Sequence, residues 1–220
     1  MIVAIDGPAG AGKSTVARAV AKRIGAGYLD TGAMYRALTW LALQRGTDLD
    51  DAEELAALAN CYPSRLSPVE DGVSVQIADT DVTAAIRAPE VTAEVSRVSA
   101  HPPVRAAIVA AQQDVIATGD WVADGRDVGT VVAPDADVKV FMTANVDERA
   151  RRRRRDLERA GQQVAQDEMV REIDRRDGID SARDASPLEV ADGALLLDTS
   201  EMTEQQVVEA VQTLVEGARG

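Results

Sequence analysis

The stretch "IVAIDGPAGAGKST", residues 2–15, decides how the rest of the chain is interpreted. A short apolar run is followed by glycines, Lys13 and Ser14, which is the P-loop pattern of strand, loop and helix. Backbone N–H groups of such a loop point at phosphate, the lysine reaches the β- and γ-oxygens, and the serine hydroxyl binds Mg²⁺. We therefore expect ATP with Mg²⁺ to be held by Gly7, Pro8, Ala9, Gly10, Ala11, Gly12, Lys13, Ser14 and Thr15, with Lys13 acting in catalysis.

Four further apolar runs, at residues 27–30, 121–124, 138–142 and 194–198, are bounded by turn residues. Continuous apolar runs are typical of parallel strands that are buried on both faces. Amphipathic helical patterns lie between them, for example Val16, Val20 and Ile24. This alternation predicts an α/β fold, a doubly wound five-stranded parallel sheet.

Two segments interrupt this alternation. Residues 61–100 begin with alternating polar and apolar residues and continue with a helical pattern after Pro89, which predicts a small antiparallel insertion followed by a helix. Residues 147–185 are highly charged and predict exposed helices that form a lid. We expect a single domain over residues 1–220.

The composition excludes several classes of function. The formal net charge is −13, the opposite of a nucleic-acid-binding footprint. One cysteine and one histidine exclude an internal disulfide framework, a paired-histidine metal site and a histidine-based triad. The chain opens on a strand pattern rather than a leader, and no apolar run approaches the roughly 18 residues of a membrane span. We expect a cytoplasmic protein that binds neither nucleic acid nor membrane.

The phosphate held by the loop could go to water or to a second molecule. A GTPase would carry Asn-Lys-x-Asp, whereas the nearest string, "NVDE" at 145–148, lacks the lysine. A motor ATPase usually has a strand ending in Asp-Glu, whereas Asp124 is followed by Gly125. Both hydrolytic interpretations are weakly supported, and Asp124 remains a possible second ligand for Mg²⁺.

Two arginines follow the ends of predicted strands, Arg36 in "LDTGAMYR" (29–36) and Arg126 in "DGRDVG" (124–129). The carboxyl ends of parallel strands converge on one ligand crevice, so these guanidinium groups are placed to hold a second anion. A surface salt bridge is the alternative for either arginine alone. In the first motif, Thr31 is expected to cap the following helix.

These motifs, together with "EIDRRDGIDSARDASPL" (172–188), resemble those of bacterial cytidylate kinases, which have an adenylate-kinase-like fold. The resemblance covers nearly the whole chain, including the 61–100 insertion. The P-loop alone is generic, whereas the other motifs are specific. The resemblance implies transfer of the ATP γ-phosphate to CMP or dCMP in pyrimidine nucleotide metabolism, Mg²⁺ dependence and a monomeric protein.

The resemblance also implies roles for individual residues. Arg36 and Arg126 would hold the acceptor phosphate, and Thr31 and Tyr35 would line the acceptor pocket. The cytosine would be read by Ser96, Arg105 and Asp127. The side chains that close over the acceptor ribose and phosphate would be those of Arg176, Asp180 and Arg183. The catalytic set would be Lys13, Arg36, Arg126, Arg176 and Arg183.

The chemistry of the acceptor agrees with these roles. A phosphate acceptor is mostly dianionic at neutral pH, so it needs guanidinium groups to offset its repulsion from ATP rather than a strong base. A carboxylate such as Asp127 accepts a hydrogen bond from cytosine N4, and Arg105 can donate to the ring acceptors. Uracil would place an acceptor opposite Asp127, which predicts discrimination against UMP.

The arginine run 151–155 is flanked by acidic residues at helical spacing, so ion pairs on a solvated helix face are the default interpretation. A lid that closes over ATP would still use some of these side chains, and Arg149, Arg152 and Arg153 are the candidates, with Arg152 and Arg153 assigned to ATP. Two other functions remain open. One is a P-loop kinase for another small molecule, such as AMP or shikimate, and the other is a nucleotide-binding switch that signals to a protein.

Overall fold

The computed structural model describes residues 1–69, 72–159, 161, 163–183 and 185–219. The ranges expected for the insertion and the lid therefore each include a few positions outside the described residues, among them Asp184 of the last quoted motif. Within the described chain, no helix is both long enough and apolar enough to cross a bilayer.

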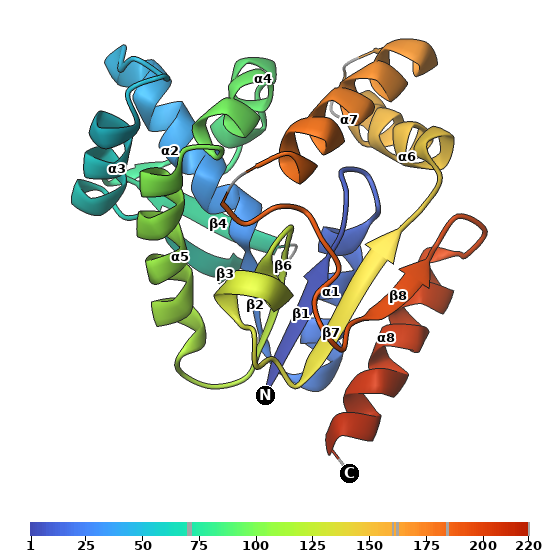
Figure 1. Ribbon diagram of the computed structural model, residues 1–220. Helices are drawn as coiled ribbons and strands as arrows, with labels where there is room; N and C mark the ends of the chain where they lie inside the picture. Colours follow the sequence, from blue (N-terminus) through green and yellow to red (C-terminus); the bar gives the residue numbers. More distant parts are fainter. Residues whose placement is uncertain (70–71, 160, 162, 184, 220) are drawn as a thin grey trace.

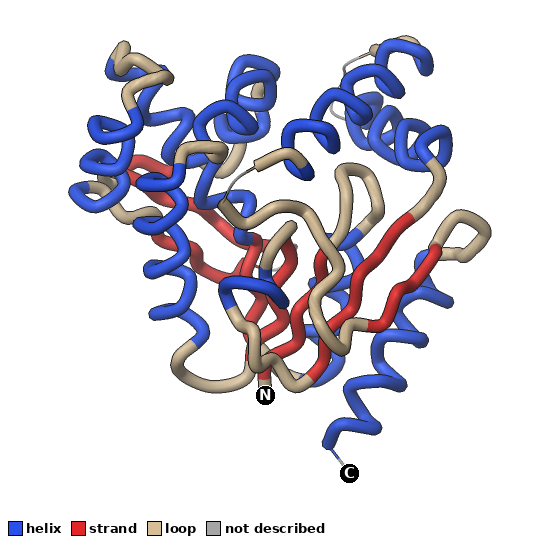
Figure 2. The backbone as a smooth tube through the Cα atoms, viewed as in Figure 1, coloured by secondary structure: helices blue, strands red, loops and turns tan. Residues whose placement is uncertain are grey.

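The five apolar runs form one parallel sheet, as predicted (Figures 1 and 2). The strands lie in the order β2-β6-β1-β7-β8, so β1 is central and β2 and β8 are the edges. All their carboxyl ends therefore lie along one edge of the sheet, where the P-loop follows β1. The bounds are β1(Ile2–Asp6), β2(Gly27–Asp30), β6(Trp121–Gly125), β7(Val138–Thr143) and β8(Leu195–Asp198).

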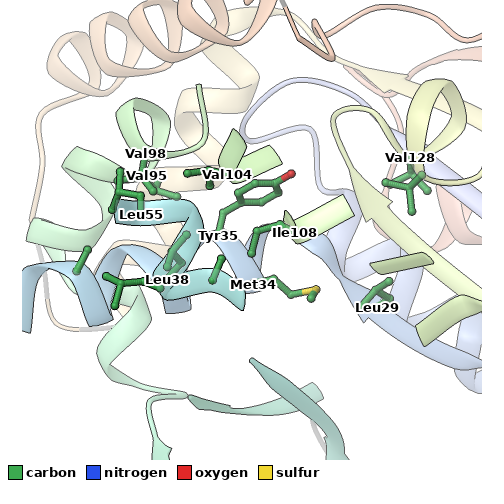
Figure 3. Packing of buried hydrophobic residues seen from close by; sticks show 14 of the residues in the cluster. Leu29, Met34, Tyr35, Leu38, Leu55, Val95, Val98, Val104, Ile108 and Val128 are labelled. Carbon is green, nitrogen blue, oxygen red and sulfur yellow. The ribbon is translucent and has the colours of Figure 1, made fainter. Parts of the chain in front are cut away.

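Helices cover both faces of the sheet, which makes the fold doubly wound. On one face, α1 and α8 pack their valines and alanines against β1, β6 and β7. On the other face, α2, α3 and α5 enclose a cluster that includes Leu38, Leu55 and Val104 (Figure 3). The bounds are α1(Lys13–Ile24), α2(Thr31–Arg45), α3(Ala52–Cys61), α5(Pro102–Ile116) and α8(Glu204–Arg219).

Helix α3 is the element that the sequence analysis did not predict. Asp51 caps it, because its carboxylate accepts a hydrogen bond from the backbone N–H of Glu54 at 2.9 Å. Leu55 is completely buried against the neighbouring helices. The signal was present in "DDAEELAALAN", an acidic cap followed by two acidic residues and an apolar face, which is a typical helix start.

The interruption after α3 contains a small antiparallel sheet, as predicted. Its strands are β3(Arg65–Val69), β4(Gly72–Ile77) and β5(Thr80–Asp81), paired in chain order. A short 3₁₀ turn, η1(Ala85–Arg87), leads into α4(Pro89–Val98), whose first residue is the expected proline. Helix α4 packs on α2 and brings Ser96 toward the carboxyl edge of the main sheet.

The charged segment forms two helices, α6(Val146–Arg159) and α7(Gln166–Ser181). They pack on each other above the P-loop, opposite α2 and α4 (Figure 1). Their shared apolar contact is small and includes Ala150, Met169 and Ile173 together with Ala9 of the P-loop. Helices α6 and α7 therefore contact the P-loop through this apolar cluster.

We expect Leu38→Ala to lower the free energy of unfolding by about 2–5 kcal/mol, because it opens a cavity in a close-packed core. The side chain of Leu38 is 1% exposed. The matched control is Leu196→Ala on β8, whose side chain is 60% exposed and should change stability by less than about 0.5 kcal/mol. Urea unfolding followed by circular dichroism measures both, and equal effects would contradict this packing.

Candidate active site

The loop between β1 and α1 needs glycine at specific positions. Gly7 has φ 144°, and a Cβ there would lie 1.9 Å from the carbonyl oxygen of Met142 on β7. Gly10 has φ 76°, and a Cβ there would lie 2.7 Å from the carbonyl oxygen of Arg149. Any side chain would therefore push the loop away from β7 and α6, so these glycines set its close approach to both.

Four carbonyl groups of this loop accept hydrogen bonds from basic side chains that come from three separate parts of the chain. Arg126 donates to Gly7 O at 2.9 Å, and Lys13 donates to Pro8 O at 2.8 Å. From α6, Arg149 donates to Ala9 O at 3.1 Å and Arg152 donates to Ala11 O at 3.3 Å.

These bonds also orient the loop's donors. The C=O and N–H of one trans peptide point in opposite directions. Fixing the carbonyls of Ala9 and Ala11 therefore turns the N–H groups of Gly10 and Gly12 away from the arginines. Gly10 and Gly12 both line a cavity beside the loop.

Lys13 is the first residue of α1, and its side chain is buried against the loop. Burial, and next the nearby Arg126, lower the pKa of Lys13 to about 7, although Asp124 and Asp6 act in the opposite direction. An anionic ligand at this point would favour the charged ammonium.

Ser14, Asp124 and Tyr28 form a hydrogen-bonded chain at the carboxyl ends of β2 and β6. The Asp124 carboxylate accepts from the Ser14 hydroxyl at 2.8 Å and from the Tyr28 hydroxyl at 2.7 Å. Burial, and next Asp30, raise the pKa of Asp124 to about 6. Burial, and next Asp124, raise the pKa of Tyr28 above its usual value, so its hydroxyl remains a donor.

The start of α2 corrects one expectation. Asp30, not Thr31, caps the helix, because its carboxylate accepts from the N–H of Ala33 at 2.9 Å while Thr31 is already helical. The Thr31 hydroxyl instead donates to the carbonyl oxygen of Asp124 at 2.7 Å. Thr31 thus joins β6 to the first turn of α2, where it also lines the cavity described next.

A second cavity, here called the arginine-lined cavity, lies between α2, α4, α7 and the ends of β2 and β6. Its wall carries seven arginines and Lys13 against five carboxylates, although the whole chain has a net charge of −13. It contains every residue predicted to bind the acceptor: Thr31, Tyr35, Arg36, Ser96, Arg105, Arg126, Asp127, Arg176, Asp180 and Arg183. Arg87, Glu172 and Arg153 also line it.

Arg36 and Arg105 are both buried in this wall. The Arg36 guanidinium donates to the Thr92 hydroxyl at 2.9 Å, and burial, with nearby Arg176, lowers its pKa to about 9. Arg105 forms an ion pair with Asp127, and its guanidinium lies 5.2 Å from the centre of the Tyr35 ring. The donors and acceptors of the Arg105–Asp127 pair are therefore fixed side by side on one wall.

Helix α7 contributes the opposite wall. Asp180 pairs with Arg126 at 2.7 Å and with Arg183, which lies just beyond the end of α7. Burial alone would raise the pKa of Asp180, but Arg126 and Arg183 lower it on balance. Burial, and next Arg126, lower the pKa of Arg176 to about 10. Arg176 and Asp180 lie four residues apart on α7, and both line the cavity.

The cavity beside the loop, here called the P-loop cavity, is lined by Gly10, Ala11, Gly12 and Thr15 and by arginines of α6. Arg152 lines it, as expected for an ATP contact, whereas Arg153 lines the arginine-lined cavity. Arg149 is held by the loop carbonyl and by an ion pair with Asp177. The two cavities share Gly10, so ligands in them would meet at the P-loop.

Sequence reasoning did not identify Asp6, Tyr28 or Asp177. The Asp6 carboxylate accepts from the N–H groups of Val128 and Gly129 at 2.8 and 2.7 Å, and burial raises its pKa to about 6. It thereby holds the π-helical turn η2(Val128–Val132) that follows Arg126 and Asp127. A polar residue at the end of an apolar strand was a usable signal for Asp6.

The model of one protein family, described as cytidylate kinase, matches residues 3–217. The chain is 47% identical to a cytidylate kinase of Carboxydothermus hydrogenoformans, and the alignment covers 94% of this chain and 94% of that relative. It is 51% identical to a bifunctional pantoate ligase/cytidylate kinase of Synechococcus sp. (strain CC9311), over 97% of this chain. The chain spans only 44% of the length of that relative.

Solved structures support the fold at much lower identity. A gluconokinase from Sinorhizobium meliloti 1021 aligns with a TM-score of 0.52 at 14% identity and covers 99% of this chain and 93% of its own. A shikimate kinase from Bacteroides thetaiotaomicron aligns with a TM-score of 0.51 at 12% identity and covers 98% of both chains. At these identities the likeness concerns the fold alone.

We expect Tyr28→Phe to lower the free energy of unfolding by about 1–3 kcal/mol, because it removes a donor from the buried Asp124 carboxylate. The matched control is Tyr62→Phe, since the Tyr62 hydroxyl makes no hydrogen bond within the described residues and should change stability by less than about 0.5 kcal/mol. Urea unfolding at neutral pH compares the two. A Tyr28→Phe variant as stable as the wild type would contradict the Ser14–Asp124–Tyr28 arrangement.

Proposed function

Because the chain belongs to the cytidylate kinase family, we propose that it transfers the γ-phosphoryl group of ATP to CMP or dCMP. The observation that carries this proposal is the pair of cavities that meet at Gly10 of the P-loop. One is lined by the glycine-rich loop and arginines of α6 and the other by Lys13 and seven arginines, which suits two phosphorylated ligands placed end to end.

ATP is assigned to the P-loop cavity. Gly10 and Gly12, the dipole of α1 and Arg152 of α6 would hold its phosphates there, and the Lys13 ammonium would reach the terminal phosphate from the adjoining arginine-lined cavity. Ser14 and Asp124 fit Mg²⁺, because they present a hydroxyl and a carboxylate oxygen 2.8 Å apart. Mg²⁺ usually keeps several waters and needs few protein ligands, and when bound it neutralises phosphate charge.

CMP is assigned to the arginine-lined cavity. Arg36 and Arg126 would hold its phosphate, since both line this cavity and Arg126 also donates to Gly7 O of the P-loop. Arg176 and Arg183 would add charge from the α7 side. Arg36 is buried and Arg176 is half-buried, so their interaction with phosphate is stronger than that of fully exposed arginines.

The cytosine is assigned to the wall formed by Ser96, Arg105 and Asp127. The Asp127 carboxylate would accept from N4, and the Arg105 guanidinium would donate to N3 or O2. Their buried ion pair fixes both groups before the base arrives. UMP would direct its O4 at Asp127 and leave two acceptors facing each other.

The reaction needs no general base from the protein. A phosphate oxygen of CMP attacks the γ-phosphorus of ATP, and the bond from that phosphorus to the bridging oxygen of ADP breaks. Lys13, Arg36 and Arg126 would hold the two anions together and offset the charge spread over the transferring group. The lid boundaries, a monomeric state and a cytoplasmic location stay predictions.

We expect ADP formation from ATP to depend on added CMP or dCMP, with kcat/KM for UMP at least about 10²-fold lower, because unpaired buried polar groups discriminate strongly. A coupled assay with CMP, dCMP, UMP, AMP and shikimate as acceptors measures this. Equal rates with CMP and UMP would contradict the cytosine assignment. Stimulation by AMP or shikimate instead would identify another P-loop kinase, and tight ATP binding without any acceptor-dependent turnover would identify a switch.

We expect Lys13→Ala to reduce kcat with CMP by at least about 10²–10³-fold, because the transferring phosphoryl group loses a buried cation. The matched control is Lys22→Ala on the same helix, whose side chain is exposed and which should keep the wild-type rate. Both variants are compared in the coupled assay under saturating nucleotides. A Lys13→Ala enzyme with near-normal kcat would rule out this role for the lysine.

A further inference from the structure

Ala9 of the P-loop is held by the lid helices on three sides. Its methyl group packs with Ala150 of α6 and with Met169 and Ile173 of α7. Its carbonyl oxygen accepts from Arg149 of α6 at 3.1 Å, and its N–H donates to the Asp177 carboxylate of α7 at 3.2 Å. One loop residue is thus tied to both helices through its side chain and through both of its backbone polar groups.

The two charged residues that hold Ala9 also hold each other. Asp177 and Arg149 form an ion pair between α7 and α6, and their side chains are only 18% and 10% exposed. Arg149 donates in addition to the carbonyl oxygen of Ala144 at 3.0 Å, at the junction of β7 and α6. The Arg149 guanidinium therefore joins the sheet, the P-loop and α7 at one point.

Helix α7 reaches the arginine-lined cavity, whereas α6 reaches both cavities. Helix α7 carries Arg176 and Asp180, which line the arginine-lined cavity on either side of Asp177 in the sequence. Helix α6 carries Arg152, which lines the P-loop cavity and donates to Ala11 O. The Asp177–Arg149 pair is therefore a direct polar contact between α7, which lines the arginine-lined cavity, and α6, which carries the arginines of the P-loop cavity.

We propose that Asp177 and Arg149 are positioning residues that couple occupancy of the arginine-lined cavity to the conformation of the P-loop. This inference rests on the proposed function, which places CMP in one cavity and ATP in the other. A ligand that draws Arg176 and the neighbouring turn of α7 inward carries Asp177 with it. Asp177 then fixes the Ala9 N–H and Arg149, and Arg149 fixes the Ala9 carbonyl that orients the Gly10 donor.

Such a coupling is reciprocal, because the factor by which one ligand changes the affinity for the other is the same in both directions. This coupling factor can be measured without turnover by calorimetric titration. A non-hydrolysable ATP analogue is titrated with and without CMP, and CMP is titrated with and without the analogue. We expect CMP to tighten analogue binding by a factor on the order of 10 in the wild type, within the usual range of couplings between sites.

The test variant is Asp177→Asn, which keeps an oxygen for the Ala9 N–H but removes the charge that pairs with Arg149. We expect it to reduce the coupling factor to roughly 1–3 while each ligand alone binds within about threefold of the wild type. The matched control is Asp174→Asn on α7, because Asp174 is exposed and forms no ion pair within the described residues. The control makes the same change of charge on the same helix but leaves the Asp177–Arg149 pair intact. It should therefore retain the wild-type coupling factor.

Arg149→Lys provides a second variant should Asp177→Asn fail to fold. A lysine keeps the charge but lacks the planar fork that reaches Ala144, Ala9 and Asp177 together, so the coupling should again fall to roughly 1–3. Full coupling in a folded variant, or a factor of 1 in the wild type, would overturn the inference while leaving the proposed function intact. A wild-type protein that does not bind CMP would instead overturn the proposed function.

Discussion

The structure depends on four basic side chains that hold the carbonyl groups of one glycine-rich loop. Lys13, Arg126, Arg149 and Arg152 come from α1, from the end of β6 and from α6, and they fix the carbonyls of Gly7, Pro8, Ala9 and Ala11. Each hydrogen bond fixes one carbonyl group of the loop. The N–H group of the same trans peptide then points in the opposite direction. The loop is thereby organised for phosphate by elements that are far apart in the sequence.

Gathering this many cations in one place has an electrostatic cost that the carboxylates of the site offset. A buried unpaired charge is expensive, and removing one member of a buried pair is costlier than never having the pair. Asp127 and Asp180 pair with Arg105, Arg126 and Arg183, so the arginine-lined cavity keeps its charges in fixed positions. This explains how a chain with a net charge of −13 sustains a strongly basic cavity.

The sequence predicted the parts of the fold that have local signals. The P-loop spacing, the apolar strands and the proline at the start of α4 are local patterns, and each was found where expected. Helix α3 was missed because it lies next to the irregular insertion, although its Asp51 cap was visible. The residues assigned to the acceptor do converge on one cavity, but that assignment came from family motifs rather than from spacing.

The remaining parts of the site depend on contacts between distant residues, which no local pattern encodes. Asp6 meets Val128 across 122 positions, and Asp177 meets Ala9 across 168. Arg153 follows Arg152 directly, yet the helical rotation between neighbours sends the two side chains to different cavities. Single residues in the charged run could therefore not be assigned until the orientation of α6 was known.

The same electrostatics would link the binding of a phosphate ligand to the protonation of Lys13. Burial lowers the pKa of Lys13 to about 7, far below the ordinary value of a lysine. A polyanion beside it favours the ammonium form and raises that pKa, so the site takes up protons as the ligand binds. Arg36 and Arg176, with pKa values of about 9 and 10, stay protonated throughout. Lys13, which packs against the P-loop, is thus the cation whose charge would change when a ligand binds. Arg36 and Arg176 of the arginine-lined cavity would keep their positive charge.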